Sequence, residues 1–430
     1  MNAVEQSLAS AEKGAPGMAP APVTPALPAQ AGAEGSGFDR WLLRRLQSHL
    51  GSPPVELAMR NGARVGTPGV SPVARLTFAS RATLLSVIAD PAMRFGDAYS
   101  NGDVTIEGSL IELLEAIYHA GRATGKRDSL LRRAVSTLRR PHFNTLTGSR
   151  NNIHHHYDIG NAFYELWLGS TMAYTCAYYP TPEATLDEAQ VAKMDHVCRK
   201  LLLKPGESVV EAGCGWGMLA MHMARRYGVR VRAFNISHEQ IAWARERAAR
   251  EGLAGRIEYV EDDYRSISGH YDAFVSVGML EHVGVRNYPT LGRIAQRVLG
   301  GRGRGLIHSI GRNHPAALQP WIEKRIFPGA YPPSLAQMAR IFEPWDLSIL
   351  DVENLRLHYA QTLHHWLALF ENASDRVRAM FDEKFVRMWR LYLAGSAAAF
   401  TTGTLQLFQV VFAPGSSNDI PWTRAHLYSP

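Results

Sequence analysis

The sequence is poor in cysteine and has no long run of hydrophobic residues, and each shortage excludes a class of protein. Its 430 residues contain three cysteines, Cys176, Cys198 and Cys214. Three are too few for a disulfide framework, so we expect them to be reduced, as in the cytosol. The N-terminus lacks the compact apolar segment with a basic front that marks a secretion signal. No charge occurs from Leu391 to Asn418, but polar residues interrupt this segment, which predicts a buried helix and a core strand rather than a membrane span.

The composition is that of a globular protein with a basic excess. Hydrophobic residues make up 46% of the chain and charged residues 20%, which excludes a chain that is disordered throughout. The length of 430 residues predicts two or three domains. The formal net charge of +7 indicates an acidic partner, for which nucleic acid and anionic lipid are both candidates.

Changes in composition along the chain predict four parts. Residues 14–36 contain seven Ala, five Pro and four Gly, too little apolar surface to offset the entropy lost on ordering. We therefore expect residues 1–37 to be a disordered tail. Residues 38–121 are expected to form a small α+β domain that contacts lipid, and residues 122–150 a basic linker. Residues 151–430 are expected to form the main domain.

Two segments concentrate the positive charge. A helix that begins near Phe38 places Trp41 and other apolar residues on one face, interleaved with arginines. Such a helix either lies on a membrane or packs on its own domain. The linker carries seven Arg and one Lys against one acid, Asp128, and is either a solvated surface or a site for anionic phosphates. Because the aromatic residues of a nucleic-acid platform are sparse here, we expect an anionic membrane surface and no nucleic acid.

From Glu207 onward, short apolar strands alternate with amphipathic helices. This alternation predicts an α/β fold with a mostly parallel sheet and helices on both faces. The string EAGCGWG, from Glu211 to Gly217, lies between the first strand and the first helix. Glycines at this point let the backbone turn tightly and approach a ligand at the carboxyl edge of the sheet. The string lacks the last glycine of a dinucleotide fingerprint and the Gly-Lys-Ser/Thr of a P-loop.

This string resembles motif I of the class I S-adenosylmethionine-dependent methyltransferases, which have a Rossmann-like sheet. The resemblance implies S-adenosylmethionine as cofactor, with its methionine end supported by Glu211. Its nucleoside would pack along the glycines, its ribose would lie at the end of the second strand, and its adenine at the end of the third. The residues implied at these places are Gly213, Gly215, Gly217, Asn235, Gln240, Asp263 and Tyr264.

Further strings resemble the cyclopropane-fatty-acyl-phospholipid synthase family from about Asn152 to Phe412. They are HHYDIGNAFYELWL, MAYTCAYY, DDYR, SVGMLEHVG, NYPTL and LQLFQVVF. Tyr174 and Thr175 of the second string join the implied cofactor site. The stretch FGDAYSNGDVTIEG is similar to the N-terminal domain of the bacterial members that act on phospholipids.

The resemblance implies transfer of a methylene to the cis double bond of an unsaturated phospholipid acyl chain. The intermediate is a carbocation, which a bound bicarbonate would deprotonate so that the ring closes. The implied cage for this anion consists of Cys176, Glu281, His308, Tyr359 and the backbone N–H of Ile310. An ionised Glu281 would repel the anion, so we expect this carboxyl to be protonated or to share a proton. No metal is expected.

An insertion at about residues 313–344 and the segment from Tyr359 to Ala399 are expected to roof an acyl channel. Its lining candidates fit an ordinary helical core equally well, and they are Trp321, Ile326, Phe327 and Tyr331. Ser396 stands where relatives can carry cysteine, which leaves open whether the product is a ring or a methyl or methylene branch.

Two other functions remain open: a small-molecule N- or C-methyltransferase, and a non-catalytic lipid-binding protein. Intact motif glycines and Glu281 disfavour the second. We expect a cytoplasmic enzyme that associates peripherally with the inner face of the cell membrane, and we leave a homodimer open.

Overall fold

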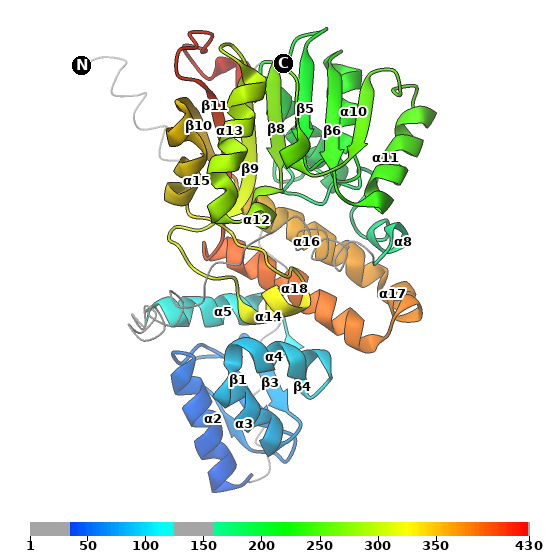
Figure 1. Ribbon diagram of the computed structural model, residues 1–430. Helices are drawn as coiled ribbons and strands as arrows, with labels where there is room; N and C mark the ends of the chain where they lie inside the picture. The colour runs from blue at the N-terminus through cyan, green and yellow to red at the C-terminus, as the bar shows by residue number, and fades with distance from the viewer. Residues whose placement is uncertain (1–34, 124–158, 429–430) are drawn as a thin grey trace, which may run out of the picture.

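Two separate β-sheets organise the protein, with a layer of helices between them (Figure 1). The computed structural model describes residues 35–123 and 159–428. Most of the predicted tail, and the predicted basic linker beyond residue 123, lie outside these residues. The predicted domain boundaries therefore stay predictions.

The N-terminal unit is built on a four-stranded sheet of order β2-β1-β3-β4. Strands β1 and β3 are parallel, whereas β2 and β4 pair antiparallel with their neighbours. Its elements are α2 (Gly37–His49), β1 (Glu56–Met59), β2 (Arg64–Val65), β3 (Ala74–Phe78), α3 (Arg81–Ala89), α4 (Pro91–Ser100), β4 (Val104–Gly108) and α5 (Leu110–Ala123). The helix expected to begin near Phe38 is α2, whereas the sequence pattern did not predict β1, α4 or β4.

Helix α2 fits both interpretations of its sequence in part. Ser36 caps its N-terminus by accepting a hydrogen bond from the Phe38 N–H, which satisfies one of the free donors at the start of a helix. Leu42 and Leu46 are buried in the core of the N-terminal unit. Phe38 and Trp41 are 54% and 52% exposed, so the helix packs on its own unit and still presents aromatic rings to the outside.

The larger unit contains a seven-stranded sheet of order β10-β11-β9-β8-β5-β6-β7. The strands from β9 to β7 are parallel, and β11 is antiparallel to both β9 and β10. The strands are β5 (Ser208–Ala212), β6 (Arg230–Asn235), β7 (Ile257–Glu261), β8 (Ala273–Val277), β9 (Arg304–Gly311), β10 (Leu347–Asn354) and β11 (Gln406–Pro414). The predicted α/β class and mostly parallel sheet are confirmed.

Helices pack on this sheet in two separate cores. The apolar residues of α9, α10 and α11 belong to one core, and those of α12, α13 and α15 to the other. The bounds are α8 (Asn161–Tyr164), α9 (Leu186–Lys200), α10 (Met218–Arg226), α11 (His238–Arg250), α12 (Leu280–Val283), α13 (Tyr288–Leu299) and α15 (Leu335–Phe342). Short 3₁₀ turns lie at η1 (Tyr264–Ser266), η2 (Val285–Asn287), η3 (Glu343–Trp345) and η4 (Ala425–Leu427).

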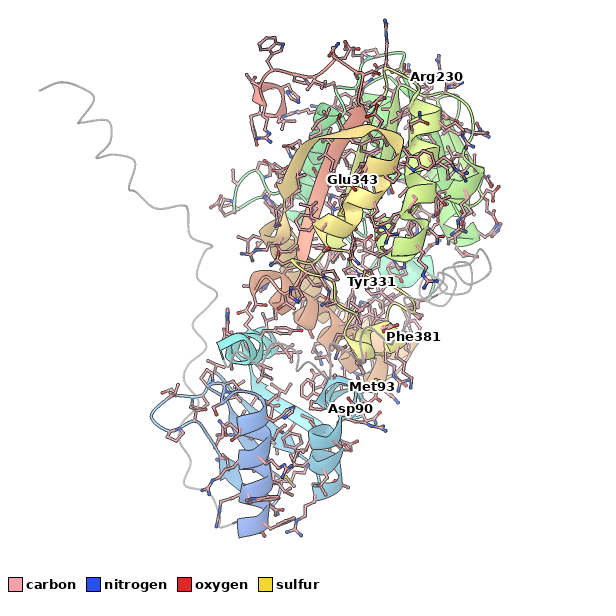
Figure 2. All side chains as sticks on the ribbon, turned by 60° about the vertical axis from the view of Figure 1, so that its left-hand side comes forward. Asp90, Met93, Arg230, Tyr331, Glu343 and Phe381 are labelled. Atoms are coloured by element: carbon pink, nitrogen blue, oxygen red, sulfur yellow. The ribbon has the colours of Figure 1, made fainter. Side chains whose placement is uncertain are left out.

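A helical layer lies between the two sheets, and it contains α14 (Pro320–Arg325), α16 (Arg356–Asn372), α17 (Ser374–Met380) and α18 (Glu383–Thr401). Arg387 of α18 ties the units together, because its guanidinium donates to the carbonyls of Tyr99 and Val104 at 2.6 and 2.7 Å. In Figure 2, Met93 of the N-terminal unit lies just below Phe381 of the helical layer. The uncharged segment is the end of α18 followed by β11, as predicted, and no described helix is long and apolar enough to cross a membrane.

Candidate active site

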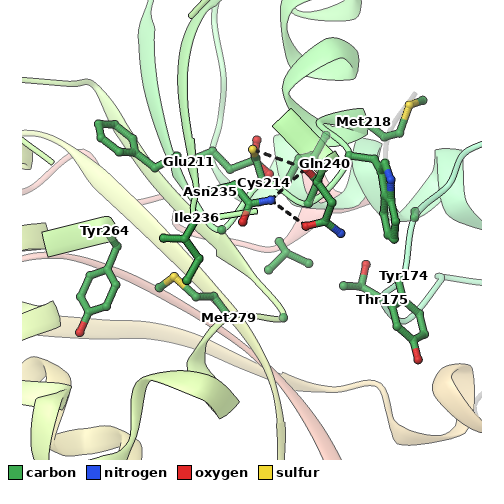
Figure 3. Close-up of a pocket in the computed structure, with 18 of the residues that line it drawn as sticks. Tyr174, Thr175, Glu211, Cys214, Met218, Asn235, Ile236, Gln240, Tyr264 and Met279 are labelled. Atoms are coloured by element: carbon green, nitrogen blue, oxygen red, sulfur yellow. Dashed lines mark hydrogen bonds between the residues drawn. The ribbon is translucent and has the colours of Figure 1, made fainter. Parts of the chain in front are cut away.

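A pocket opens at the carboxyl ends of β5, β6 and β8, the edge at which an open parallel sheet binds its ligands (Figure 3). Most of the residues that the resemblance implied for the cofactor line it, whereas none of those implied for the anion cage does. The implied cofactor residues in its wall are Tyr174, Thr175, Glu211, Gly213, Gly215, Asn235, Gln240, Asp263 and Tyr264. Gly217 is not in the wall and instead precedes α10 as its N-cap.

The motif loop between β5 and α10 needs its glycines for two different reasons. Gly213 and Gly217 have φ angles of 83° and 76°, which side chains rarely adopt. A Cβ on Gly213 would lie 2.8 Å from that of Met279, and one on Gly217 would strike the Tyr259 ring. Around Gly215 the space is open, so its backbone borders the pocket and leaves room for a ligand.

At the end of β6, the side-chain amides of Asn235 and Gln240 line the pocket and are hydrogen-bonded to each other. Asn235 Nδ2 donates to Gln240 Oε1 at 2.8 Å and to the Gly215 carbonyl at 3.2 Å (Figure 3). Ser237 caps α11 and accepts a hydrogen bond from the Gln240 N–H. This geometry fits the ribose hydroxyls of the implied cofactor, because amides both donate and accept hydrogen bonds.

The end of β7 contributes Asp263 and Tyr264. Asp263 caps η1, since its Oδ1 accepts a hydrogen bond from the Arg265 N–H at 2.9 Å. The side chain of Tyr264 is buried, and burial raises the pKa of its phenol. Both residues lie where an adenine would meet the third strand.

The pocket wall holds two buried ionisable groups, one of which sequence reasoning missed. Glu211 is 2% exposed, and burial raises the pKa of its carboxyl to about 8. Lys193 of α9 is 3% exposed, and burial lowers the pKa of its ammonium to about 8. The signal that could have revealed Lys193 is its place in an apolar stripe, four residues after Ala189 and four before Val197.

Tyr174 stands in a dense group of aromatic rings beside the pocket. Its hydroxyl lies 2.8 Å from that of Tyr392, and its ring centroid lies 5.3 to 5.5 Å from those of Trp167, Tyr164 and Trp366. The faces of aromatic rings stabilise nearby cations. This group therefore suits a site that handles a sulfonium or a carbocation.

Of the implied anion cage, the structure brings Glu281 and Ile310 together. The Ile310 N–H donates to Glu281 Oε1 at 2.5 Å. The backbone N–H that the resemblance assigned to an anion is thus occupied by the carboxyl itself. Glu281 Oε2 is buried without a hydrogen-bond partner among the described residues, and burial raises the pKa of Glu281 to about 7, in line with the expected proton.

His308 is buried and neutral. Its Nδ1 accepts a hydrogen bond from Gln409 Nε2 at 3.0 Å, which leaves the proton on Nε2. Nε2 is buried and has no partner among the described residues. Burial holds the pKa of His308 well below its usual value, so this ring is a donor at neutral pH and not a cation.

Cys176 and Tyr359 meet at a shared acceptor, the carbonyl of Leu355. The thiol of Cys176 lies 3.8 Å from this oxygen, and the Tyr359 N–H donates to it at 3.1 Å. Burial raises the pKa of the Cys176 thiol far above its usual value, so it is no nucleophile. That all five residues surround one anion stays a prediction.

The lining candidates of the acyl channel do not line the described pocket. Trp321 faces the N-terminal unit, where it packs on Gly96 and donates to Asp97 Oδ1 at 3.2 Å. Trp321 therefore packs in a helical core, which is the alternative that its sequence left open, and its place in an acyl channel stays a prediction. Phe327 lies closer to the site, with its ring centroid 6.2 Å from that of His282, which lines the pocket.

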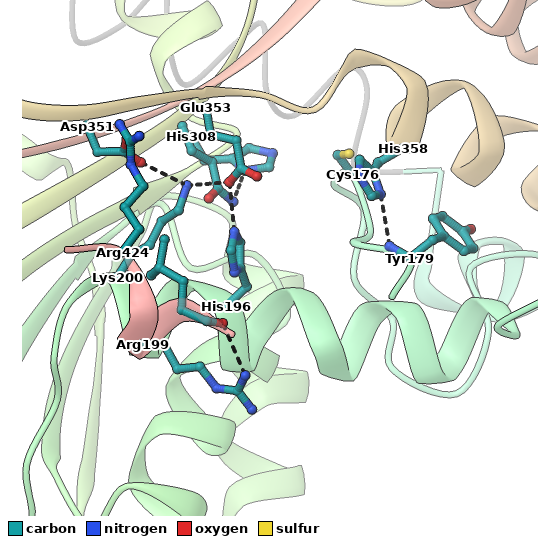
Figure 4. Close-up of polar contacts among 12 residues, drawn as sticks. Cys176, Tyr179, His196, Arg199, Lys200, His308, Asp351, Glu353, His358 and Arg424 are labelled. Carbon is teal, nitrogen blue, oxygen red and sulfur yellow. Dashed lines mark hydrogen bonds and ion pairs between the residues drawn. The ribbon is translucent and has the colours of Figure 1, made fainter. Parts of the chain in front are cut away.

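A second cluster of polar residues lies outside the cofactor pocket, next to the MAYTCAYY segment (Figure 4). Glu353 accepts hydrogen bonds from His196 and Lys200 at 2.7 and 2.6 Å. Burial alone would raise the pKa of Glu353, but these two partners lower it to about 2. The Tyr178 ring stacks between His196 and His358, with centroids 4.3 and 4.8 Å away. The cluster thus fixes the MAYTCAYY segment against α9 and α16.

The parallel sheet, the glycine loop and the polar strand ends define a class I S-adenosylmethionine-dependent methyltransferase. The chain belongs to the mycolic acid cyclopropane synthetase family, which it matches over residues 144–410. A domain family of unknown function matches residues 42–129.

Named relatives agree with this assignment. A probable fatty acid methyltransferase of Pseudomonas putida is 37% identical over 80% of this chain and 89% of its own. The cyclopropane-fatty-acyl-phospholipid synthase of Escherichia coli is 40% identical over 63% of this chain and 69% of its own. The crystal structure of mycolic acid cyclopropane synthase CmaA1, complexed with SAH and CTAB, superposes with a TM-score of 0.59 at 29% identity, over 61% of this chain and 97% of that one.

Proposed function

We propose that the protein is a cyclopropane-fatty-acyl-phospholipid synthase. It transfers a methylene from S-adenosylmethionine to the cis double bond of an unsaturated phospholipid acyl chain. The bound cofactor supplies an electrophilic sulfonium methyl. The observation that carries the proposal is Glu281, a buried carboxyl with a pKa of about 7, one oxygen held by a backbone N–H and the other without a partner among the described residues.

The chain's own residues provide what this chemistry needs. Tyr174 lines the pocket, and its ring can stabilise a positive charge there. The His308 Nε2 proton, and the proton that neutral Glu281 would carry on Oε2, are two buried donors without partners among the described residues. Bicarbonate both donates and accepts hydrogen bonds, so these groups fit it. It would serve as the base that removes a proton from the transferred methyl.

Mass spectrometry of lipids from cells that express this chain tests the proposal. We expect phospholipid acyl chains that have gained one methylene and lost their double bond, with fragments diagnostic of a ring. Glu281→Gln serves as the matched control, because it keeps the size of the side chain.

A second function has support from the Pseudomonas putida relative, which is named a fatty acid methyltransferase and covers more of this chain than the Escherichia coli enzyme does. Fragments diagnostic of a methyl or methylene branch in the same experiment would favour it. A soluble amine acceptor would be favoured by activity that does not require phospholipid vesicles.

We also propose that the enzyme works at the anionic inner face of the cell membrane. The exposed rings of Phe38 and Trp41 on α2 support this, because amphipathic aromatic residues favour the membrane interface. Arg45 lies over the Trp41 ring, with its Cζ 5.7 Å from the centroid, so charge and ring are presented together.

A further inference from the structure

Lys193 is a buried cation in the wall of the cofactor pocket. Its Nζ donates to the Thr175 hydroxyl at 2.9 Å. Thr175 lines the same pocket, and its methyl group is closely confined, since a Cβ on Gly278 would lie 2.8 Å from Thr175 Cγ2. The hydroxyl therefore holds the ammonium at the wall of the pocket.

A comparison within α9 shows what this ammonium lacks. Lys200 is buried on the same helix, at 4% exposed, and its Nζ pairs with Glu353 at 2.6 Å. Lys193 is buried to the same degree, yet it forms no ion pair with any described residue and has only a hydroxyl as partner. A buried charge without a counter-ion is costly, so the site is completed by an anion from outside the chain.

Glu211 lines the same pocket, and it and Lys193 attract each other through space, but the two groups form no ion pair or hydrogen bond. Glu211 Oε2 has no hydrogen-bond partner among the described residues. The pocket therefore presents a separate ammonium and a separate carboxyl on one side. An amino acid carries the opposite pair, a carboxylate and an ammonium on one carbon.

We propose that Lys193 binds the α-carboxylate at the amino-acid end of S-adenosylmethionine, with the Thr175 hydroxyl holding Nζ in place and Glu211 facing the α-ammonium. The inference rests on the cofactor of this family and not on the identity of the lipid product. Lys193 is thus a cofactor-binding residue outside the glycine motif.

Calorimetric titration with two probes tests the assignment. S-adenosylhomocysteine carries the amino-acid end, whereas 5′-methylthioadenosine shares the nucleoside and sulfur but lacks that end. We expect Lys193→Met to bind S-adenosylhomocysteine roughly 10- to 100-fold more weakly, since a charge-assisted hydrogen bond is lost. Its affinity for 5′-methylthioadenosine should equal that of the wild type.

Lys204→Met is the control, because it removes an exposed ammonium just beyond the same helix and outside the pocket, and it should bind both probes as the wild type does. Lys193→Gln is the second variant if Lys193→Met does not fold. It can still donate to Thr175 but has no charge, and it should also lose affinity for S-adenosylhomocysteine alone. Equal losses for both probes would show a merely structural role and overturn the inference, as would unchanged affinity for S-adenosylhomocysteine. A wild type that binds neither probe would overturn it together with the cofactor assignment, whereas the lipid product is tested separately.

Discussion

Burial favours the protonated form of Glu281, and this makes the free energy of unfolding depend on pH. The pKa of this carboxyl rises from 4.5 to about 7 because it is desolvated. The folded state therefore holds a proton that the unfolded state releases between these values, and stability falls as pH rises through this window. Such a shift corresponds to about 3 kcal/mol above pH 7.

We therefore expect Glu281→Gln to be more stable than the wild type at pH 8 and about equally stable at pH 4, below the pKa of the unfolded carboxyl, because glutamine stays neutral. Chemical denaturation at the two pH values measures this. Glu246→Gln, at an exposed carboxyl, should change little at either pH. A Glu281→Gln protein with the same stability gain at both values would contradict the assignment of the pH effect to this group.

The same substitution should impair turnover far more than cofactor binding. If Glu281 and His308 hold a base in the transition state, kcat and kcat/KM of Glu281→Gln fall together. Positioned proton transfer is worth about 10² to 10⁴ in rate, so we expect a loss in that range with unchanged affinity for S-adenosylhomocysteine.

Removal of dissolved carbon dioxide should slow the wild type, and added bicarbonate should restore it. An unchanged rate after depletion would reject the external base. Near-native turnover by Glu281→Gln would leave this carboxyl a packing role only.

Single residues differ in how far the sequence could predict them. Gly213 and Asn235 were predictable, because a glycine loop and a polar strand end have local signatures that the topology then places at one edge. Gln409 has no such signature, since its role depends on a contact with a distant strand. The only sequence signal of Lys193 is its place in an apolar stripe, and its contact with Thr175 could not be read from that. The Ile310 N–H was assigned by resemblance, and which acceptor it takes could come only from three-dimensional packing.

At the scale of elements, the close packing of α4 against α14 depends on the glycine at position 96, which has no side chain. Gly96 lies within α4, and a Cβ there would lie 2.5 Å from the Trp321 ring. We expect Gly96→Ala to separate α14 from α4 and to lower the melting temperature, although alanine favours helix by about 1 kcal/mol.

Gly395→Ala in α18 is the control, because its new Cβ would make only an ordinary contact of 3.8 Å with Leu114. It should stabilise the protein slightly. Differential scanning calorimetry compares the melting temperatures of the two variants. A Gly96→Ala protein that melts as high as Gly395→Ala would show that α4 and α14 do not pack closely at Gly96.

Elements with strong periodicity were predictable and short or interrupted ones were not. The alternation from β5 to β9 was found because each strand is a buried run between capped helices. Strand β1 has four residues, and α4 contains Gly96 and begins at Pro91. Such segments carry too little pattern to stand out, and tertiary contacts with α18 and α14 stabilise α4.

At the scale of the whole molecule, α2 should govern membrane binding. We expect wild-type protein to prefer anionic over neutral vesicles, and this preference should weaken as salt screens the charges over about 8 Å. Arg45→Gln should lower binding to anionic vesicles by roughly fivefold, in line with about 1 kcal/mol per basic residue at the surface.

Trp41→Ala should lower binding to both vesicle types, because it removes apolar contact and not charge. Trp422→Ala is its control, as Trp422 is fully exposed in the C-terminal segment. Vesicle sedimentation at two salt concentrations measures all of these. Equal binding of wild type to neutral and anionic vesicles at low salt would refute the electrostatic part.

The position of β11 has a consequence for biosynthesis. This strand is near the C-terminus, yet it sits between β9 and β10 and is buried along its whole length. Until residues 406–414 have left the ribosome, β9 and β10 both present unpaired edges, and such edges recruit other chains. A nascent chain therefore cannot complete this sheet before its last strand in chain order, β11, has been synthesised. The step that completes the fold is a long-range insertion, which is slow because distant segments must meet.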